Sequence, residues 1–167
     1  MKERNEKMSR KCRKQINLDV LIIDNMPVQA KSLQSELEIG QLKVVSHIVN
    51  IPSGDNKNRQ IPQGTIDKVF YIIEKYEPKI ILVDVCLDES VFDTSAEKRA
   101  TWTGPYLMSE IRKCFANQKM ASYSAYSRYL KSVDEDIEDQ RKAYGVEDTP
   151  HWNATKINSD LIKSILN

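Results

Sequence analysis

The stretch KIILVD, residues 79–84, is a short apolar run that ends on the carboxylate of Asp84. An earlier run, DVLII at residues 19–23, ends in the same way on Asp24 and Asn25. Continuous β-branched runs of this length are typical of strands buried on both faces of a parallel sheet. An acid at the end of such a strand lies at the carboxyl edge of the sheet, where open α/β folds bind their ligands. If the two strands are neighbours, Asp24 and Asp84 repel each other, and both stay ionised only beside a cation or a lysine.

Strand-like and helix-like segments alternate along the rest of the chain. Besides 18–23 and 79–84, we expect strands at 43–49, 118–124 and 152–155. Helices are expected to begin at Pro27, after an N-cap at Thr65, at Gly104, near Leu130 and after an N-cap at Asn158. The residues expected to face inward are Val28, Leu33, Leu37, Ile66, Val69, Phe70, Ile73, Leu107, Ile111, Cys114, Phe115, Leu130, Val133, Ile137, Leu161, Ile162, Ile165 and Leu166. Five strands alternating with five helices predict an α/β fold, a doubly wound five-stranded parallel sheet with helices on both faces. The topological rule for such sheets puts strand one in the middle, flanked by strands two and three, so we expect the flavodoxin-like order 2-1-3-4-5.

The length of 167 residues fits one domain, which we place at residues 17–167. Residues 1–16 form a basic tail, with seven Lys or Arg against two Glu in the first fourteen positions. Such a tail can touch nucleic acid or anionic lipid, but its composition favours a disordered leader.

Several classes of function are excluded by missing motifs. There is no apolar stretch near the ~20 residues that span a bilayer, and the charged N-terminus is not a secretory signal. The three cysteines are odd in number and lack metal-ligand spacing, which favours a reduced cytoplasmic setting. Neither a dinucleotide fingerprint, nor a P-loop, nor a G-x-S-x-G elbow is present.

One group of polar residues remains at the predicted strand ends: Asp24, Asn25, Asp84, Ser124 and Lys156. In this setting VLIIDNMPV, residues 20–28, resembles the first strand and loop of bacterial two-component response-regulator receiver domains (CheY-like). Its Met-Pro-Val continuation is closest to the subgroup that carries LuxR-type output domains. The run ending in Asp84 resembles the family's phospho-acceptor strand, Ser124-Ala125 its strand-four hydroxyl and alanine, and Lys156 the lysine before its last helix. Gly145 falls at the family's turn before strand five, so the resemblance covers about residues 18–166.

The resemblance implies a magnesium-dependent phosphorelay in which Asp84 accepts a phosphoryl group. Asp24, Asp84 and the backbone carbonyl of Cys86 would hold the Mg²⁺, with Asn25 as a further candidate ligand. On this reading the protein is not an enzyme but a phosphoryl acceptor that promotes its own phosphorylation. Catalysis would consist of positioning and charge neutralisation.

The same resemblance implies that two further residues, Lys156 and Ser124, contact the phosphoryl group. Lys156 would neutralise the acceptor and then bind a phosphoryl oxygen, and Ser124 would donate a hydrogen bond to the phosphoryl group. The added charge would bias a two-state surface and so switch partner binding. The implied partners are a sensor histidine kinase or a phosphotransfer protein, and a second copy of the chain in a homodimer. Nucleic acid would be reached only through an output domain absent from this chain, and no membrane is expected.

The chain departs from the family pattern in four places. Asn25 replaces a second acid and should weaken Mg²⁺ binding. The span 85–103 is much longer than the usual turn and could be a lid, a partner epitope or a tolerated surface insertion. We favour the insertion, because loops absorb length at little cost. Ile157 stands where a proline is usual, and Asn153 occupies the aromatic switch position.

Two other functional classes stay open. The first is a pseudo-receiver, a phosphorylation-independent module that binds other proteins through the same fold. The second is a haloacid-dehalogenase-like phosphatase, which requires D-x-D where this chain has Asp24-Asn25-Met26 and is therefore disfavoured.

Overall fold

The computed structural model describes residues 17–51, 61–87, 103–124 and 131–167, without the side chains of 131–134 and 136. Several expectations lie outside these residues: the disordered basic tail, the proposed surface insertion in most of 85–103, and the inward packing of Leu130 and Val133.

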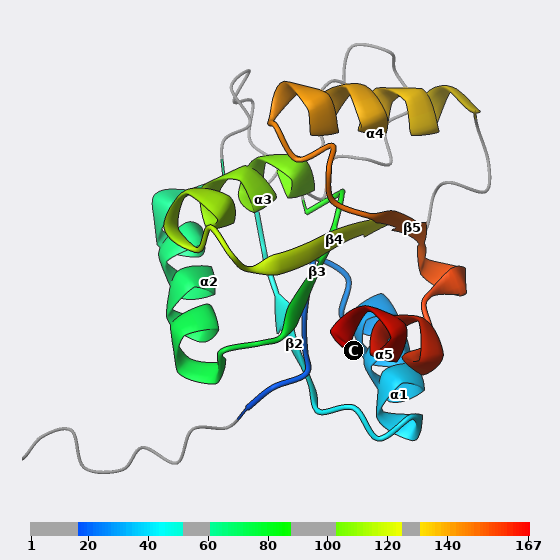
Figure 1. Ribbon diagram of the computed structural model, residues 1–167. Coiled ribbons are helices and arrows are strands. Elements are labelled where there is room, and N and C mark those ends of the chain that lie inside the picture. Colours follow the sequence, from blue (N-terminus) through cyan, green and yellow to red (C-terminus); the bar gives the residue numbers. More distant parts are fainter. Residues whose placement is uncertain (1–16, 52–60, 88–102, 125–130) are drawn as a thin grey trace, which may run out of the picture.

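The described residues form a five-stranded parallel sheet of order β2-β1-β3-β4-β5 (Figure 1). The strands are β1 (Val20–Asp24), β2 (Val44–Ile48), β3 (Ile80–Asp84), β4 (Lys119–Ser124) and β5 (His151–Asn153). Every residue of β1 and β3 is buried, as expected for central strands covered on both faces. The predicted fold class and strand order are confirmed.

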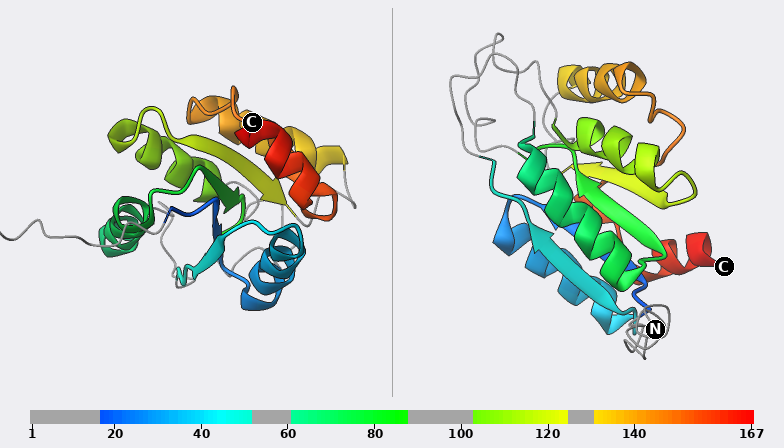
Figure 2. Two further views of the ribbon diagram at one scale, coloured as in Figure 1. Left: turned by 60° about the horizontal axis from the view of Figure 1, so that its bottom comes forward. Right: turned by 90° about the vertical axis from the view of Figure 1, so that its left-hand side faces the viewer.

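Five helices cover both faces of the sheet; four of them connect successive strands, and α5 follows the last strand (Figures 1 and 2). They are α1 (Pro27–Ile39), α2 (Gln63–Tyr76), α3 (Thr103–Cys114), α4 (Lys131–Ala143) and α5 (Ser159–Leu166), with a 3₁₀ turn at Ala154–Lys156. Helices α1 and α5 lie on one face, and α2 and α3 on the other. Within the described ranges, no helix combines the length and apolarity needed to cross a membrane.

The core consists of two apolar layers, one on each face, because side chains along a strand alternate between faces. On β1, Leu21 and Ile23 join the layer under α2 and α3, whereas Val20 and Ile22 join the layer under α1 and α5. Full burial of each such side chain contributes roughly 1.5–3 kcal/mol. By the same alternation, Asp24 follows Ile22 toward α1 and α5.

Two inward-facing expectations were wrong. Val28 is 80% exposed, and Ala30 takes its place in the buried stripe with Leu33 and Leu37. Five positions at 100° each put Val28 about 140° from Leu33 around the helix axis, so it cannot share that stripe. Cys114 is exposed because it is the last residue of α3, where the helix leaves the core.

Two element boundaries also differ from expectation. Helix α2 begins at Gln63, with Pro62 as its N-cap residue, so Thr65 lies inside the first turn instead of capping it. Strand β5 ends at Asn153, whose side chain accepts a hydrogen bond from the Thr155 amide at 3.0 Å. That bond caps the 3₁₀ turn and ends the strand two residues early.

Candidate functional site

Asp24 and Asp84 lie side by side at the carboxyl edge of the sheet. Strands β1 and β3 are direct neighbours with Ile23 opposite Val83, so the two acids that follow occupy one level of the sheet. They are 0% and 2% exposed, and each raises or lowers the pKa of the other through direct side-chain interaction. The structure thus brings together the two acids that the strand pattern singled out.

The surroundings of this acid pair favour the neutral form of one member. Burial raises the pKa of Asp84 well above its usual range, and the charge of Asp24 raises it further. Burial also raises the pKa of Asp24, although hydrogen bonds from Tyr123 and the Met26 amide act in the opposite direction. Two such carboxyl groups titrate as a unit. A divalent cation between them would neutralise their charges and lower both pKa values again.

Tyr123 is a component of the site that the sequence analysis missed. Its hydroxyl donates a 2.6 Å hydrogen bond to Asp24 Oδ2, and the Met26 amide donates a 2.8 Å bond to Oδ1. Tyr123 is fully buried and lies directly opposite Asp84 in the pairing of β3 with β4. Burial, then the charges of Asp84 and Asp24, raise the pKa of its phenol well above the usual range. The available signal was a hydroxyl-bearing residue one position before the end of an apolar strand.

The first turn of α3 holds the backbone that follows Asp84. The Gly104 amide donates to the Val85 carbonyl at 3.0 Å, and the Leu87 amide donates to Thr103 Oγ1 at 2.9 Å. A Cβ on Gly104 would lie 2.1 Å from the Asp84 carbonyl oxygen, so only glycine permits this approach. The Cys86 amide adds a long 3.4 Å bond to Asp84 Oδ1.

Ser124 and Lys156 are placed differently from the acid pair. Ser124 is buried at the end of β4, but it follows Tyr123, so its side chain leaves from the opposite face of the sheet. Lys156 ends the 3₁₀ turn with an exposed side chain and forms no ion pair with Asp24 or Asp84 among the described residues. The early end of β5 keeps Lys156 at the surface. In the part of the chain that the structure describes, Lys156 is therefore not paired with Asp84, and Ser124 leaves the sheet from the face opposite to that of Asp84.

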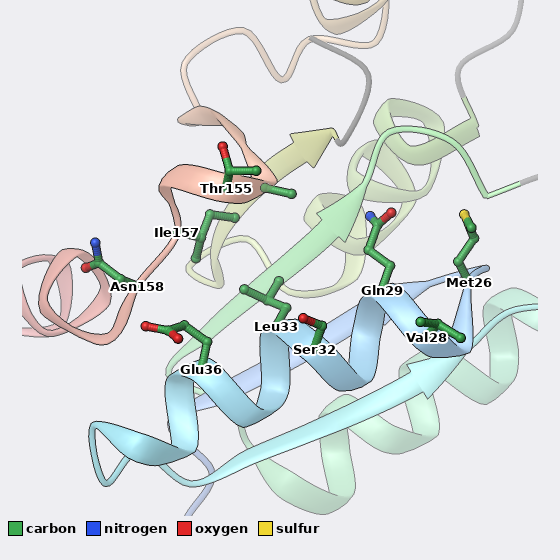
Figure 3. A pocket seen from close by; sticks show the side chains of 10 residues that line it. Met26, Val28, Gln29, Ser32, Leu33, Glu36, Thr155, Ile157 and Asn158 are labelled. Carbon is green, nitrogen blue, oxygen red and sulfur yellow. The ribbon is translucent and has the colours of Figure 1, made fainter. Parts of the chain in front are cut away.

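A groove of about 690 Å³ lies beside the site, between α1 and the turn that leads into α5 (Figure 3). Gln29, Leu33 and Glu36 line its α1 side, and Thr155, Ile157 and Asn158 line the other. Neither acid lines the groove, but Met26, whose amide donates to Asp24, is one of its lining residues.

The donor set of the site fits a hard cation that keeps part of its water shell. The described residues contain no cluster of three or more His, Cys, Asp or Glu side chains that could hold a metal. A cation between Asp24 and Asp84 would therefore complete its coordination with backbone oxygens, such as that of Cys86, and with water. Mg²⁺ prefers such a set of one or two carboxylates with retained waters, whereas structural Zn²⁺ requires four protein ligands.

Comparison with known proteins identifies the fold but not a family. No family model and no curated protein matches the sequence. Three solved structures illustrate the similarity in fold. The RcsB response regulator of Salmonella typhimurium is 14% identical with a TM-score of 0.53, over 90% of this chain and 59% of that one. A response regulator from Thermotoga maritima is 18% identical with a TM-score of 0.50, over 89% and 94% of the two chains. A sensor protein from Polaromonas sp. JS666 is 14% identical with a TM-score of 0.56, over 89% and 92%.

The chain thus has the CheY-like fold of response-regulator receiver domains, at low sequence identity to them. It spans about three-fifths of the RcsB regulator. The likeness to the LuxR-type subgroup stays a prediction.

Proposed function

We propose that this protein is a receiver domain that accepts a phosphoryl group from a sensor histidine kinase or a phosphotransfer protein in a Mg²⁺-dependent phosphorelay. The observation that carries the proposal is the buried pair of Asp24 and Asp84, which end neighbouring strands at the carboxyl edge of a receiver-like sheet. Such a pair supports metal binding because a cation offsets both the cost of burying two charged carboxylates and the repulsion between them. The site would act in the cytoplasm, where these partners are expected.

The acceptor in this proposal is the Asp84 carboxylate. One of its oxygens attacks the phosphorus atom, the bond from phosphorus to the donor histidine nitrogen breaks, and the histidine leaves. Bound Mg²⁺ would neutralise the negative charge that spreads over the transferred oxygens. Thr103 and Gly104 hold the backbone that follows Asp84, through hydrogen bonds with Leu87 and Val85. Asp24 supplies the second carboxylate from the neighbouring strand. Cys86 would offer its backbone carbonyl to the metal, and Asn25 is a further candidate ligand.

Ser124 and Lys156 keep their proposed roles toward the phosphoryl group, and each side chain must move to fill its role. Because the Ser124 side chain leaves from the face of the sheet opposite to Asp84, its hydroxyl must turn around the strand end to reach a phosphoryl group. Because the Lys156 side chain is exposed, it must turn inward to bind a phosphoryl oxygen on Asp84. The charge added to Asp84 would then change the surface that partners bind.

A second candidate function is a pseudo-receiver that binds partners without phosphorylation. One observation favours it: Asp24 is satisfied by Tyr123 and Met26, and Lys156 stands apart from the acid pair. A site whose polar groups are already paired can be stable without a cation.

Phosphoryl uptake separates the two functions. The protein is incubated with acetyl phosphate and Mg²⁺, or with EDTA, and its intact mass is measured. We expect the mass gain of one phosphoryl group with Mg²⁺, its loss with EDTA, and its loss in Asp84→Asn. Asp67→Asn, which changes an exposed acid on α2, should behave like the wild type. No mass gain in the wild type with Mg²⁺ would favour the pseudo-receiver.

A further inference from the structure

The hydrogen bond between Tyr123 and Asp24 joins two strands that are not neighbours. Strand β3 lies between β4 and β1, so the two residues are about two strand spacings, roughly 10 Å, apart in the sheet. Tyr123 is opposite Asp84 and shares its face, and its hydroxyl continues past Asp84 to reach Asp24 Oδ2 at 2.6 Å. The phenol thus spans the whole acid pair.

Both oxygens of Asp24 are held, and by separate elements. Tyr123 donates from β4 to Oδ2, and the Met26 amide donates from the residue before α1 to Oδ1. With both oxygens fixed, the carboxylate cannot rotate freely about its χ2 angle. Each oxygen keeps a second lone pair, and the neighbour toward which Asp24 turns is Asp84.

Packing in the core would explain why Tyr123 is buried, but not why its hydroxyl donates to Asp24. Tyr123 packs in the layer that also contains Ile157 and Trp152, where phenylalanine would fill the same space. A buried phenol needs an acceptor, and a main-chain carbonyl would serve that purpose. The acceptor here is instead the side chain that the strand pattern marks as a metal ligand.

We propose that Tyr123 is a positioning residue that orients the Asp24 carboxylate for a divalent cation. This inference rests on the function proposed above and adds to it a residue on β4 that contacts a ligand and not the cation itself. Hydrogen-bond partners of metal ligands fix the ligand's orientation, and their loss typically weakens metal affinity by 10–100-fold. Tyr123→Phe should therefore weaken Mg²⁺ binding while leaving the fold in place.

The test is a calorimetric Mg²⁺ titration of the wild type, Tyr123→Phe, Asp24→Asn and the double variant. We expect Tyr123→Phe to lose roughly tenfold or more in affinity. The double variant should bind no more weakly than Asp24→Asn, because the hydroxyl acts only through Asp24. Tyr106→Phe removes a hydroxyl from an α3 ring that stacks edge-on with Tyr144, and its affinity should equal that of the wild type.

The outcomes separate this inference from the function on which it rests. Wild-type affinity in Tyr123→Phe, or tighter binding, would overturn the positioning role and leave the metal-dependent function standing. A wild type that binds no Mg²⁺ would overturn both. Circular dichroism establishes that each variant is folded.

A second measurement covers the case in which Tyr123→Phe does not fold. In the wild type, the buried Tyr123 hydroxyl proton is followed by NMR during a Mg²⁺ titration. A shift of this resonance that saturates with binding supports the inference, because the hydroxyl then senses the cation through Asp24. A resonance that does not move while Mg²⁺ binds overturns it.

Discussion

Replacing Gly104 by alanine should strongly destabilise the protein and disturb the acceptor. The new Cβ would lie 2.1 Å from the Asp84 carbonyl oxygen, 2.6 Å from Val85 Cα and 2.9 Å from the Asp84 carbonyl carbon. All three are backbone atoms, so no side chain can swing aside. Strand β3 is paired on both sides by β1 and β4 and cannot yield easily, so the N-terminus of α3 must move.

The size of the effect follows from three contributions. Overpacking against backbone costs about 3 kcal/mol, the upper part of the usual range. Opening the contact from 2.1 to 3.0 Å requires the start of α3 to move by 0.9 Å. This movement strains two hydrogen bonds, from Gly104 to Val85 and from Leu87 to Thr103. Weakening these bonds costs about 1 kcal/mol more. Alanine has a higher helix propensity than glycine, which stabilises the variant by about 1 kcal/mol, so the free energy of unfolding should fall by about 3 kcal/mol in total.

Urea unfolding followed by circular dichroism measures this loss, and Gly64→Ala is the matched control. A Cβ on Gly64, in the first turn of α2, meets nothing within 4 Å. The same substitution there should stabilise the protein by about 0.5–1 kcal/mol. If Gly104→Ala lies within about 0.5 kcal/mol of the wild type, the contact between α3 and β3 is not tight and the reasoning fails.

Three other predictions follow from the site and its supports. Asn25→Asp should tighten Mg²⁺ binding several-fold in calorimetry and lower the melting temperature in EDTA, because it adds a third carboxylate; unchanged or weaker affinity would show that position 25 does not face the metal. In EDTA, stability should fall as pH rises above 3.8, the ordinary pKa of an aspartate, through the raised pKa values of Asp24 and Asp84. The folded state binds more protons than the unfolded state there, so unfolding becomes easier with pH; melts should show a smaller slope in Asp84→Asn, and an equal slope would contradict the assignment. Arg141→Met should cost about 2–3 kcal/mol in urea unfolding, because the buried guanidinium donates to the Thr149 carbonyl, and a loss below about 0.5 kcal/mol would mean that this bond contributes little.

The features that depend on local pattern could be predicted from the sequence. The apolar runs located β1 and β3, and the alternation of elements predicted a parallel sheet covered on both faces. The strand order followed from the topological rule for doubly wound sheets. The placement of Asp24 and Asp84 followed, because each comes last in a central strand. Gly145 also falls in its expected turn, where its φ of +67° favours glycine.

The features that depend on register and on strand length could not be predicted. Tyr123 reaches Asp24 only because β4 pairs with β3 in one register, and a shift of one residue would turn its ring to the other face. The exposure of Lys156 depends on where β5 stops. That point is decided by the hydrogen bond from Thr155 to Asn153, which competes with a fourth strand residue.

Two hydrogen bonds join Val85 and Leu87 to the start of α3, and so bring together residues that are far apart in the sequence. Leu87 and Thr103 are hydrogen-bonded although they lie 16 positions apart in the sequence. Both ends of the intervening span are therefore fixed beside the acceptor strand. Each doubling of the length of a closed chain segment costs only about 0.6 kcal/mol. Lengthening the span between Leu87 and Thr103 should therefore cost little stability and leave Asp84 in its place against Gly104.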